Sequence, residues 1–106
     1  MYLKIYDMFR LKDRIPYADG SIAKKIVMQN HSGLSLLMAV DKGLEIPTHT
    51  ANADVLVQVI DGSMEFNIED KVIELKEGDA LTMTPGVKHS LKATERFKVL
   101  VTKLNA

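Results

Sequence analysis

Histidine is the side chain in this sequence best suited to chemistry. The chain has three histidines, His31, His49 and His89, and no cysteine, so thiol nucleophiles, disulfides and cysteine-bound zinc are excluded. An imidazole transfers protons near neutral pH, ligates transition metals through a neutral ring nitrogen, and hydrogen-bonds anions when it is charged. We expect His31 to be exposed, because it lies in the turn-forming run 30–33. His49 and His89 remain as candidates for a functional site.

Other catalytic patterns are missing from the sequence. It contains no Gly-x-Ser-x-Gly motif, no phosphate-binding loop and no His-Glu-x-x-His pair, which excludes the commonest hydrolase, nucleotide-binding and metalloprotease signatures. Neighbouring acids such as Glu65 and Asp70 alternate with apolar residues, as side chains on exposed strand faces do. We interpret them as surface residues.

Composition limits the classes of partner. A chain of 106 residues suffices for one domain with its own core. Its 14 basic residues are balanced by 14 acidic ones without long runs of one sign, so neither nucleic acid nor a membrane is an expected partner. The first residues alternate charged and apolar side chains and lack the pattern of a secretory signal. We therefore expect a cytoplasmic protein.

The elements that must position the histidines are predicted to be strands. From Ser21 onward, short apolar runs alternate with turn signals about every ten residues, which is typical of a sandwich or barrel. In 63–68, for example, Met64, Phe66 and Ile68 lie on one face by alternation. The sequence therefore predicts an all-β protein with strands at 22–29, 34–40, 55–60, 63–68, 72–75, 80–84, 89–91 and 97–102.

The first twenty residues are predicted to form a separate arm. Their apolar residues fit both a helical face and a strand, and Pro16 and Asp19-Gly20 separate them from the rest of the chain. We predict an N-terminal arm over 1–20, packed on a barrel domain over 21–106. The strand 55–60 is apolar on both faces, so one face is expected to be covered by the core and the other by the arm or by a second subunit. A homodimer is the natural candidate.

Two spaced motifs resemble those of the cupin superfamily. Gly43, His49 and Gly62 match the first cupin motif, in which a glycine is followed by a His-x-His pair, a glutamate and a second glycine. Ala51 stands at the second histidine of this motif and Val55 at the glutamate. The sequence of this motif is similar to that of a subgroup of small bacterial single-domain cupins without a settled activity.

The second motif lies at the family's usual separation from the first. Gly78, Pro85, Gly86 and His89 follow in its order, with the proline one place late. The resemblance covers roughly residues 34–102. It implies a double-stranded β-helix, the jelly-roll barrel of cupins, with Gly62 and Gly78 at tight turns that need positive φ.

The resemblance also implies a metal site, which is degenerate here. In cupins the histidines and the glutamate converge on a divalent metal, and only His49 and His89 remain of this set. Metal sites with two protein ligands are weak, so iron, manganese, zinc, nickel or copper would need a third donor. Asp54 is the nearest candidate, but successive strand residues face opposite sides. Asp54 would need a bulge to share the face of residues 49, 51 and 55.

The predicted ligand pocket therefore contains mainly apolar side chains around the two histidines. Met38 and Met83, and also Met28, line it only if their strands face inward, and methionines usually fill gaps in apolar interiors. The predicted pocket consists of His49, His89, Ala51, Val55, Met38 and Met83, with His49 and His89 as the candidate metal ligands.

Four functions are compatible with these residues. The leading hypothesis is a small-molecule-binding barrel with an incomplete metal site. The second is a metal-dependent cupin enzyme, of dioxygenase, isomerase or decarboxylase type, acting on a small carboxylate or ketone. A metal-free isomerase that uses the histidines as acid and base and a purely structural dimer module are the others.

Overall fold

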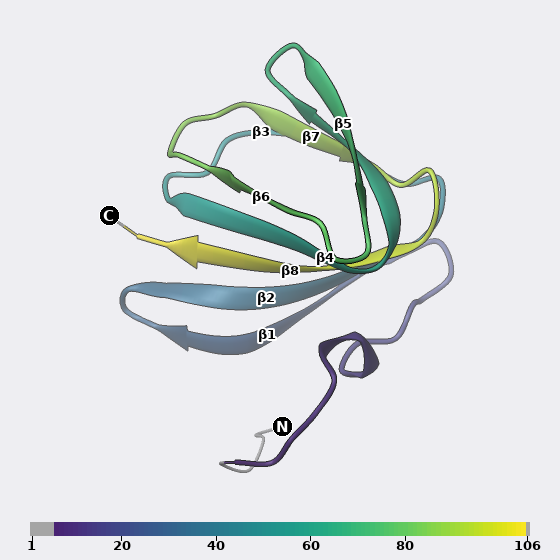
Figure 1. The fold of residues 1–106 in the computed structure, drawn as a ribbon, viewed down its shortest axis with the longest axis vertical. Coiled ribbons are helices and arrows are strands. Elements are labelled where there is room, and N and C mark those ends of the chain that lie inside the picture. Colours follow the sequence, from purple (N-terminus) through teal and green to yellow (C-terminus); the bar gives the residue numbers. More distant parts are fainter. Residues whose placement is uncertain (1–5, 106) are drawn as a thin grey trace.

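The alternation of apolar and polar residues is realised as antiparallel strands in the computed structural model, which describes residues 6–105 (Figure 1). Besides one turn of 3-10 helix, η1 (Leu11–Asp13), this part of the chain forms eight strands, which confirms the predicted all-β class. The strands are β1 (Ile22–Asn30), β2 (Gly33–Val40), β3 (Glu45–His49), β4 (Asp54–Ile68), β5 (Lys71–Lys76), β6 (Ala80–Met83), β7 (His89–Lys92) and β8 (Phe97–Leu104).

The strands form two layers that share β4. Sheet A contains β1, β2, β8, the first half of β4, and β6. Sheet B contains β3, β7, the second half of β4, and β5. Figure 1 shows β4 crossing from the lower layer to the upper one, so that its two halves belong to facing sheets.

The long strand β4 corrects one prediction. The sequence predicts a turn at Asp61-Gly62 between two strands, but the structure has one strand of 15 residues there. The register with β8 shifts between Val59 and Asp61, which places a bulge at the expected turn. Gly62 has φ +72°, and a Cβ there would overlap the Arg96 carbonyl oxygen. Gly62 therefore marks a bend within the strand, whereas Gly78, with φ +94°, does lie in a turn as predicted.

A second correction concerns 45–49, which belongs to the first motif but is not predicted as a strand. It forms β3, which pairs with β7. Its side chains are mostly exposed and Pro47 interrupts it, so it lacks the apolar alternation by which a strand is predicted.

The main core fills the space between the two sheets. The strand β4 changes parity at its bulge. The inward side chains are therefore Val57 and Val59 before the bulge and Met64 and Phe66 after it. The largest side chains of this core are less than 2% exposed. They are Phe66, Phe97, Met64, Val40, Val59 and Val99.

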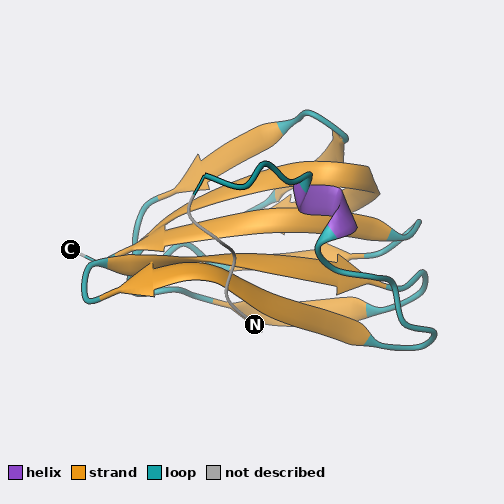
Figure 2. Cartoon of the chain, turned by 90° about the horizontal axis from the view of Figure 1, so that it is seen from below, coloured by secondary structure: helices purple, strands orange, loops and turns teal. Residues whose placement is uncertain are grey.

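A smaller core lies between the N-terminal segment and the outer face of sheet A. Figure 2 shows this segment and η1 crossing the face of the strands. Ile15, 3% exposed, packs with Leu37 and Ala39, and half-buried Ile60 joins this cluster. The part of the predicted arm before residue 6 lies outside the described residues. Within the described part, the segment covers one end of the sheet face on which β4 is apolar.

Ion pairs of Arg96 also connect the N-terminal segment to the barrel. Its guanidinium donates to Asp41 and to Asp19, each at 2.7 Å, and lies over the Tyr17 ring. The Gly20 N–H and then Arg96 hold the pKa of Asp41 at about 2, well below its usual value. Hydrogen bonds to the ionised carboxylate therefore connect the segment to the barrel.

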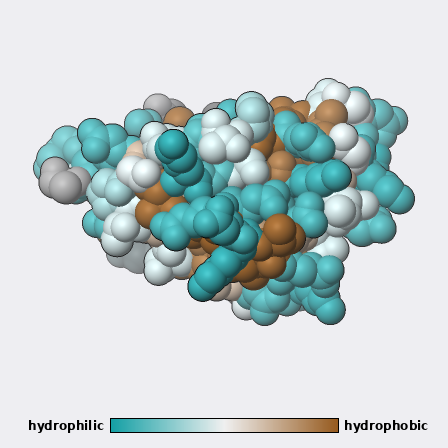
Figure 3. Space-filling model, turned by 90° about the horizontal axis from the view of Figure 1, so that it is seen from above, coloured by the Kyte–Doolittle hydropathy of each residue, from teal (hydrophilic) through white to brown (hydrophobic). Residues whose placement is uncertain are grey.

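The surface of the barrel carries both hydrophobic and hydrophilic side chains. Figure 3 shows hydrophobic patches between hydrophilic side chains on the face seen from above. No helix within residues 6–105 is long and apolar enough to cross a membrane.

Candidate functional site

The predicted pocket residues surround one cavity of about 140 Å³ between the two sheets. The cavity is mostly apolar, because the inward positions of β2, β4 and β8 carry Leu, Met, Val and Phe. All six residues predicted from sequence line it, namely His49, His89, Ala51, Val55, Met38 and Met83.

The two histidines are brought together by strand pairing. His49, at the end of β3, is the register partner of His89 at the start of β7. Their ring centroids lie 4.1 Å apart with the planes inclined at 58°, and Phe66 stacks on His89 at 5.7 Å. His49 is solvent-exposed whereas His89 is 8% exposed. The pair therefore extends from the solvent side of the cavity into its interior.

Backbone carbonyls orient both rings in the same way. Nδ1 of His49 donates to the Pro47 carbonyl and Nδ1 of His89 to the Val87 carbonyl, both at 2.9 Å. In this tautomer each Nε2 carries a lone pair, and neither Nε2 is hydrogen-bonded within the described part of the chain. The site therefore offers two oriented acceptors to a ligand.

The surroundings of His89 favour its neutral form. Burial lowers the pKa of His89, and the charges of His49 and Lys103 lower it further, against the opposing effect of the hydrogen bond to Val87. A neutral His89 acts as a hydrogen-bond acceptor or a proton acceptor toward a bound molecule.

The donor set does not fit a tightly held divalent metal. Ala51 and Val55 bring only hydrocarbon to the cavity, and Asp54 lies on the other face of β4, in a separate depression with Leu56 and Thr82. Asp54 pairs with Leu104, and the register of β4 with β8 is regular from 54 to 59, so alternation along β4 places Asp54 on the face opposite Val55. Within residues 6–105, no cluster of three or more His, Asp or Glu has metal-binding geometry.

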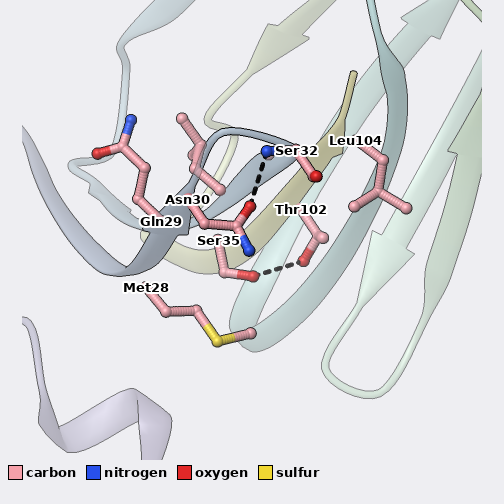
Figure 4. Close-up of a pocket in the computed structure, with 9 residues that line it drawn as sticks. Met28, Gln29, Asn30, Ser32, Ser35, Thr102 and Leu104 are labelled. Carbon is pink, nitrogen blue, oxygen red and sulfur yellow. Dashed lines mark hydrogen bonds between the residues drawn. The ribbon is translucent and has the colours of Figure 1, made fainter. Parts of the chain in front are cut away.

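The methionines divide between two faces. Met38 and Met83 line the cavity, whereas Met28 lies in an outer depression at the end of sheet A with Ser35 and Leu104 (Figure 4). Simple alternation would place Met28 on the same face as Lys24, but the β1–β2 register shifts between residues 26 and 28. This bulge turns Met28 to the outside.

Seven apolar and two charged residues that line the cavity are missing from the pocket predicted by sequence. Lys24 on β1 and Lys103 on β8 also line the cavity. Lys103 continues the inward series Phe97, Val99 and Val101, so period-two alternation along β8 is a signal that points to it. No such signal points to Lys24, because Lys25 beside it leaves both faces of that strand partly polar.

Known proteins share this fold. The family model described as the cupin domain matches residues 36–103, and no curated protein matches the chain. Similar solved structures include conserved protein SPY1581 of unknown function from Streptococcus pyogenes, at TM-score 0.90 and 22% identity over 98% of this chain and 91% of that one. A cupin superfamily protein from Desulfitobacterium hafniense has TM-score 0.92 and 19% identity over 98% and 95%.

A third similar structure belongs to a longer chain. The cupin 2 conserved barrel domain protein from Leptotrichia buccalis has TM-score 0.87 and 28% identity, over 92% of this chain and 47% of that one. These similarities confirm the expected double-stranded β-helix.

Proposed function

Because this chain belongs to the cupin superfamily as a type-2 cupin domain protein, we propose that it is a small-molecule-binding barrel whose ligand occupies the cavity at His49 and His89. The observation that carries the proposal is the pair of imidazoles 4.1 Å apart, each oriented by a backbone carbonyl, on the wall of an apolar cavity. Apolar walls with a few oriented polar atoms are typical of small-molecule sites.

The size of the cavity limits the ligand. A cavity of about 150 Å³ lined by apolar side chains accommodates benzene, and this one has about 140 Å³. The proposed ligand therefore has a compact hydrocarbon part of about six carbon atoms. Its polar group reaches the histidines at the solvent side.

The test is a titration followed by amide NMR spectra. Benzyl alcohol and benzoate are expected to shift the backbone amides of Ala51, Val55 and Leu91, which line the cavity. An Ala51→Leu variant is expected to lose these shifts because the added side chain fills the cavity. Ala80→Leu, the same change at an exposed position of β6, is the control and should keep them. If neither compound shifts cavity amides of the folded native protein, the proposal is wrong.

A metal-dependent cupin enzyme is the second candidate. The hydrogen bonds from Nδ1 of both imidazoles to backbone carbonyls favour it. Metal-bound histidines usually donate their other ring N–H to a carbonyl or carboxylate, as both histidines do here. The donor set argues against it, so elemental analysis of untagged protein is expected to give clearly less than one metal per chain. One equivalent of metal that a His49→Ala, His89→Ala double variant loses would instead establish the second candidate.

A further inference from the structure

Two lysines line the barrel cavity, where hydrocarbon side chains are the rule. Solvent-exposed Lys24 on β1 and Lys103 on β8 line the cavity with the histidines. Lys103 is half-buried beside Val55, its register partner on β4, and its charge acts on His89. An ammonium group partly removed from water needs a counter-charge or hydrogen-bond acceptors to offset its lost hydration.

The protein supplies no counter-charge to these lysines within the described residues. None of the residues lining the cavity is Asp or Glu, and neither Lys24 nor Lys103 is in any ion pair that this part of the chain forms. Three surface lysines, Lys42, Lys76 and Lys92, each lie within 4.0 Å of a carboxylate. The cavity therefore has a positive potential on an otherwise apolar wall.

This potential opposes a cation and favours an anion. Where the cupin metal set has a histidine and a glutamate, the chain has Ala51 and Val55, and Lys103 adds a positive charge next to Val55. A bound divalent cation would be repelled by this ammonium group. A carboxylate at the same place gains a charge-assisted hydrogen bond.

We infer that the cavity takes a small organic monocarboxylate, whose compact apolar part packs against Met38, Met83 and Phe66 and whose carboxylate is held by Lys103. Lys24 adds positive potential from β1, and the Nε2 atoms of the two histidines accept hydrogen bonds from any hydroxyl group of the ligand. The inference rests on the proposed function, since it names the class of molecule for the same cavity.

A carboxylate fits the cavity better than a phosphate. No arginine lines it, and arginine is the side chain that matches phosphate with paired hydrogen bonds. A phosphate group would also leave little of the 140 Å³ for hydrocarbon, although most of the wall is apolar.

The experiment compares three probes of similar shape and different charge. Calorimetric titrations with benzoate, benzyl alcohol and benzylamine are done on the native protein with and without EDTA. Benzoate is expected to bind at least about tenfold more tightly than benzyl alcohol, a ratio typical of one charge-assisted hydrogen bond. Benzylamine is expected to bind most weakly, and EDTA is expected to change nothing.

Variants assign the preference to the cavity lysines. Lys103→Met keeps a long apolar side chain and should reduce benzoate affinity to that of benzyl alcohol while leaving the alcohol unchanged. Lys24→Met should have a smaller effect in the same direction. Lys71→Met, on the exposed edge of β5, is the matched control and should keep the native preference. Thermal melts establish that each variant is folded.

The outcomes separate this inference from the proposed function. If benzyl alcohol binds as tightly as benzoate, or if Lys103→Met keeps the preference, the carboxylate inference is wrong and the binding barrel stands. If EDTA abolishes benzoate binding, a metal rather than Lys103 holds the carboxylate, and the inference is wrong. If no probe binds, both are wrong.

Discussion

At the scale of single residues, the site is defined by what surrounds two imidazoles. His89 is covered by Phe66 on one side and faces His49 on the other. Strand pairing and a backbone carbonyl hold each ring, so its orientation does not depend on a bound ligand. A preoriented polar pair loses little entropy when a molecule binds.

Burial of His89 predicts a pH-dependent stability. The pKa of His89 is lowered in the folded state from its usual 6.5, first by burial and then by His49 and Lys103. The unfolded chain therefore takes up a proton at a higher pH than the folded chain does. The free energy of unfolding is expected to be highest above pH 6.5 and to fall as the pH drops from there to the folded-state value.

Denaturant unfolding of variants at several pH values measures this effect. His89→Gln is expected to flatten the profile below pH 6.5, the usual pKa of histidine, whereas His31→Gln, in the exposed turn between β1 and β2, should leave it as in the native protein. An identical slope in the native protein and His89→Gln would contradict the assignment to His89.

At the scale of elements, the bent strand β4 joins the two halves of the site. Its first half carries Val55 and Val57 and its second half Phe66, and all three line the cavity. The bend between them depends on Gly62, whose φ of +72° and closeness to the Arg96 carbonyl exclude a side chain. A single backbone position therefore sets how the two sheets face each other.

Gly62→Ala is expected to destabilise the protein strongly. Both the positive φ and the overlap of the new Cβ with backbone atoms contribute, and the expected loss is about 3 kcal/mol or more. Gly78→Ala is the control, because φ there is also positive, at +94°, but nothing lies within 4 Å of the new Cβ. It should cost about 1 kcal/mol. Chemical denaturation measures the loss of unfolding free energy in both variants. Equal losses would show that the backbone around Gly62 shifts enough to relieve the overlap.

At the scale of the whole molecule, the outer face of sheet A is covered only in part. The N-terminal segment packs over Leu37, Ala39 and Ile60, while Met28 and Leu104, 68% and 55% exposed, lie at the other end of the same sheet face. Packing of the N-terminal segment therefore accounts for the apolar side chains at one end of this sheet face.

The homodimer expected from the apolar strand 55–60 stays a prediction. Sedimentation equilibrium is expected to give twice the chain mass for the native protein. Leu104→Glu is expected to shift the equilibrium toward single chains, because it places a charge on the uncovered end of sheet A. Val72→Glu, on exposed β5, is the control. A native mass equal to one chain would refute the dimer.

Much of this protein was predictable from local pattern. The period-two alternation in 63–68 and 97–102 identifies strands and their apolar faces, because side chains of any extended strand alternate. The same parity argument leaves Asp54 outside the site, whereas the resemblance to the cupin motifs is what predicts a common pocket for His49, His89, Ala51 and Val55. Parity and spacing depend on residues close together in the chain, so the amino-acid order alone is enough to predict them.

Bulges, strand pairing and the cavity lysines depend on tertiary structure. The local sequence Asp61-Gly62 indicates a turn. Instead β4 runs through these residues as one strand, because its first half pairs with β8 and its second half pairs with β5 and β7. A bulge in β1 sends Met28 outward, and the curling of sheet A brings Lys24 to the cavity. The pairing partners lie far apart in the chain, and a shift of one residue exchanges the two faces of a strand, so local pattern alone leaves these positions open.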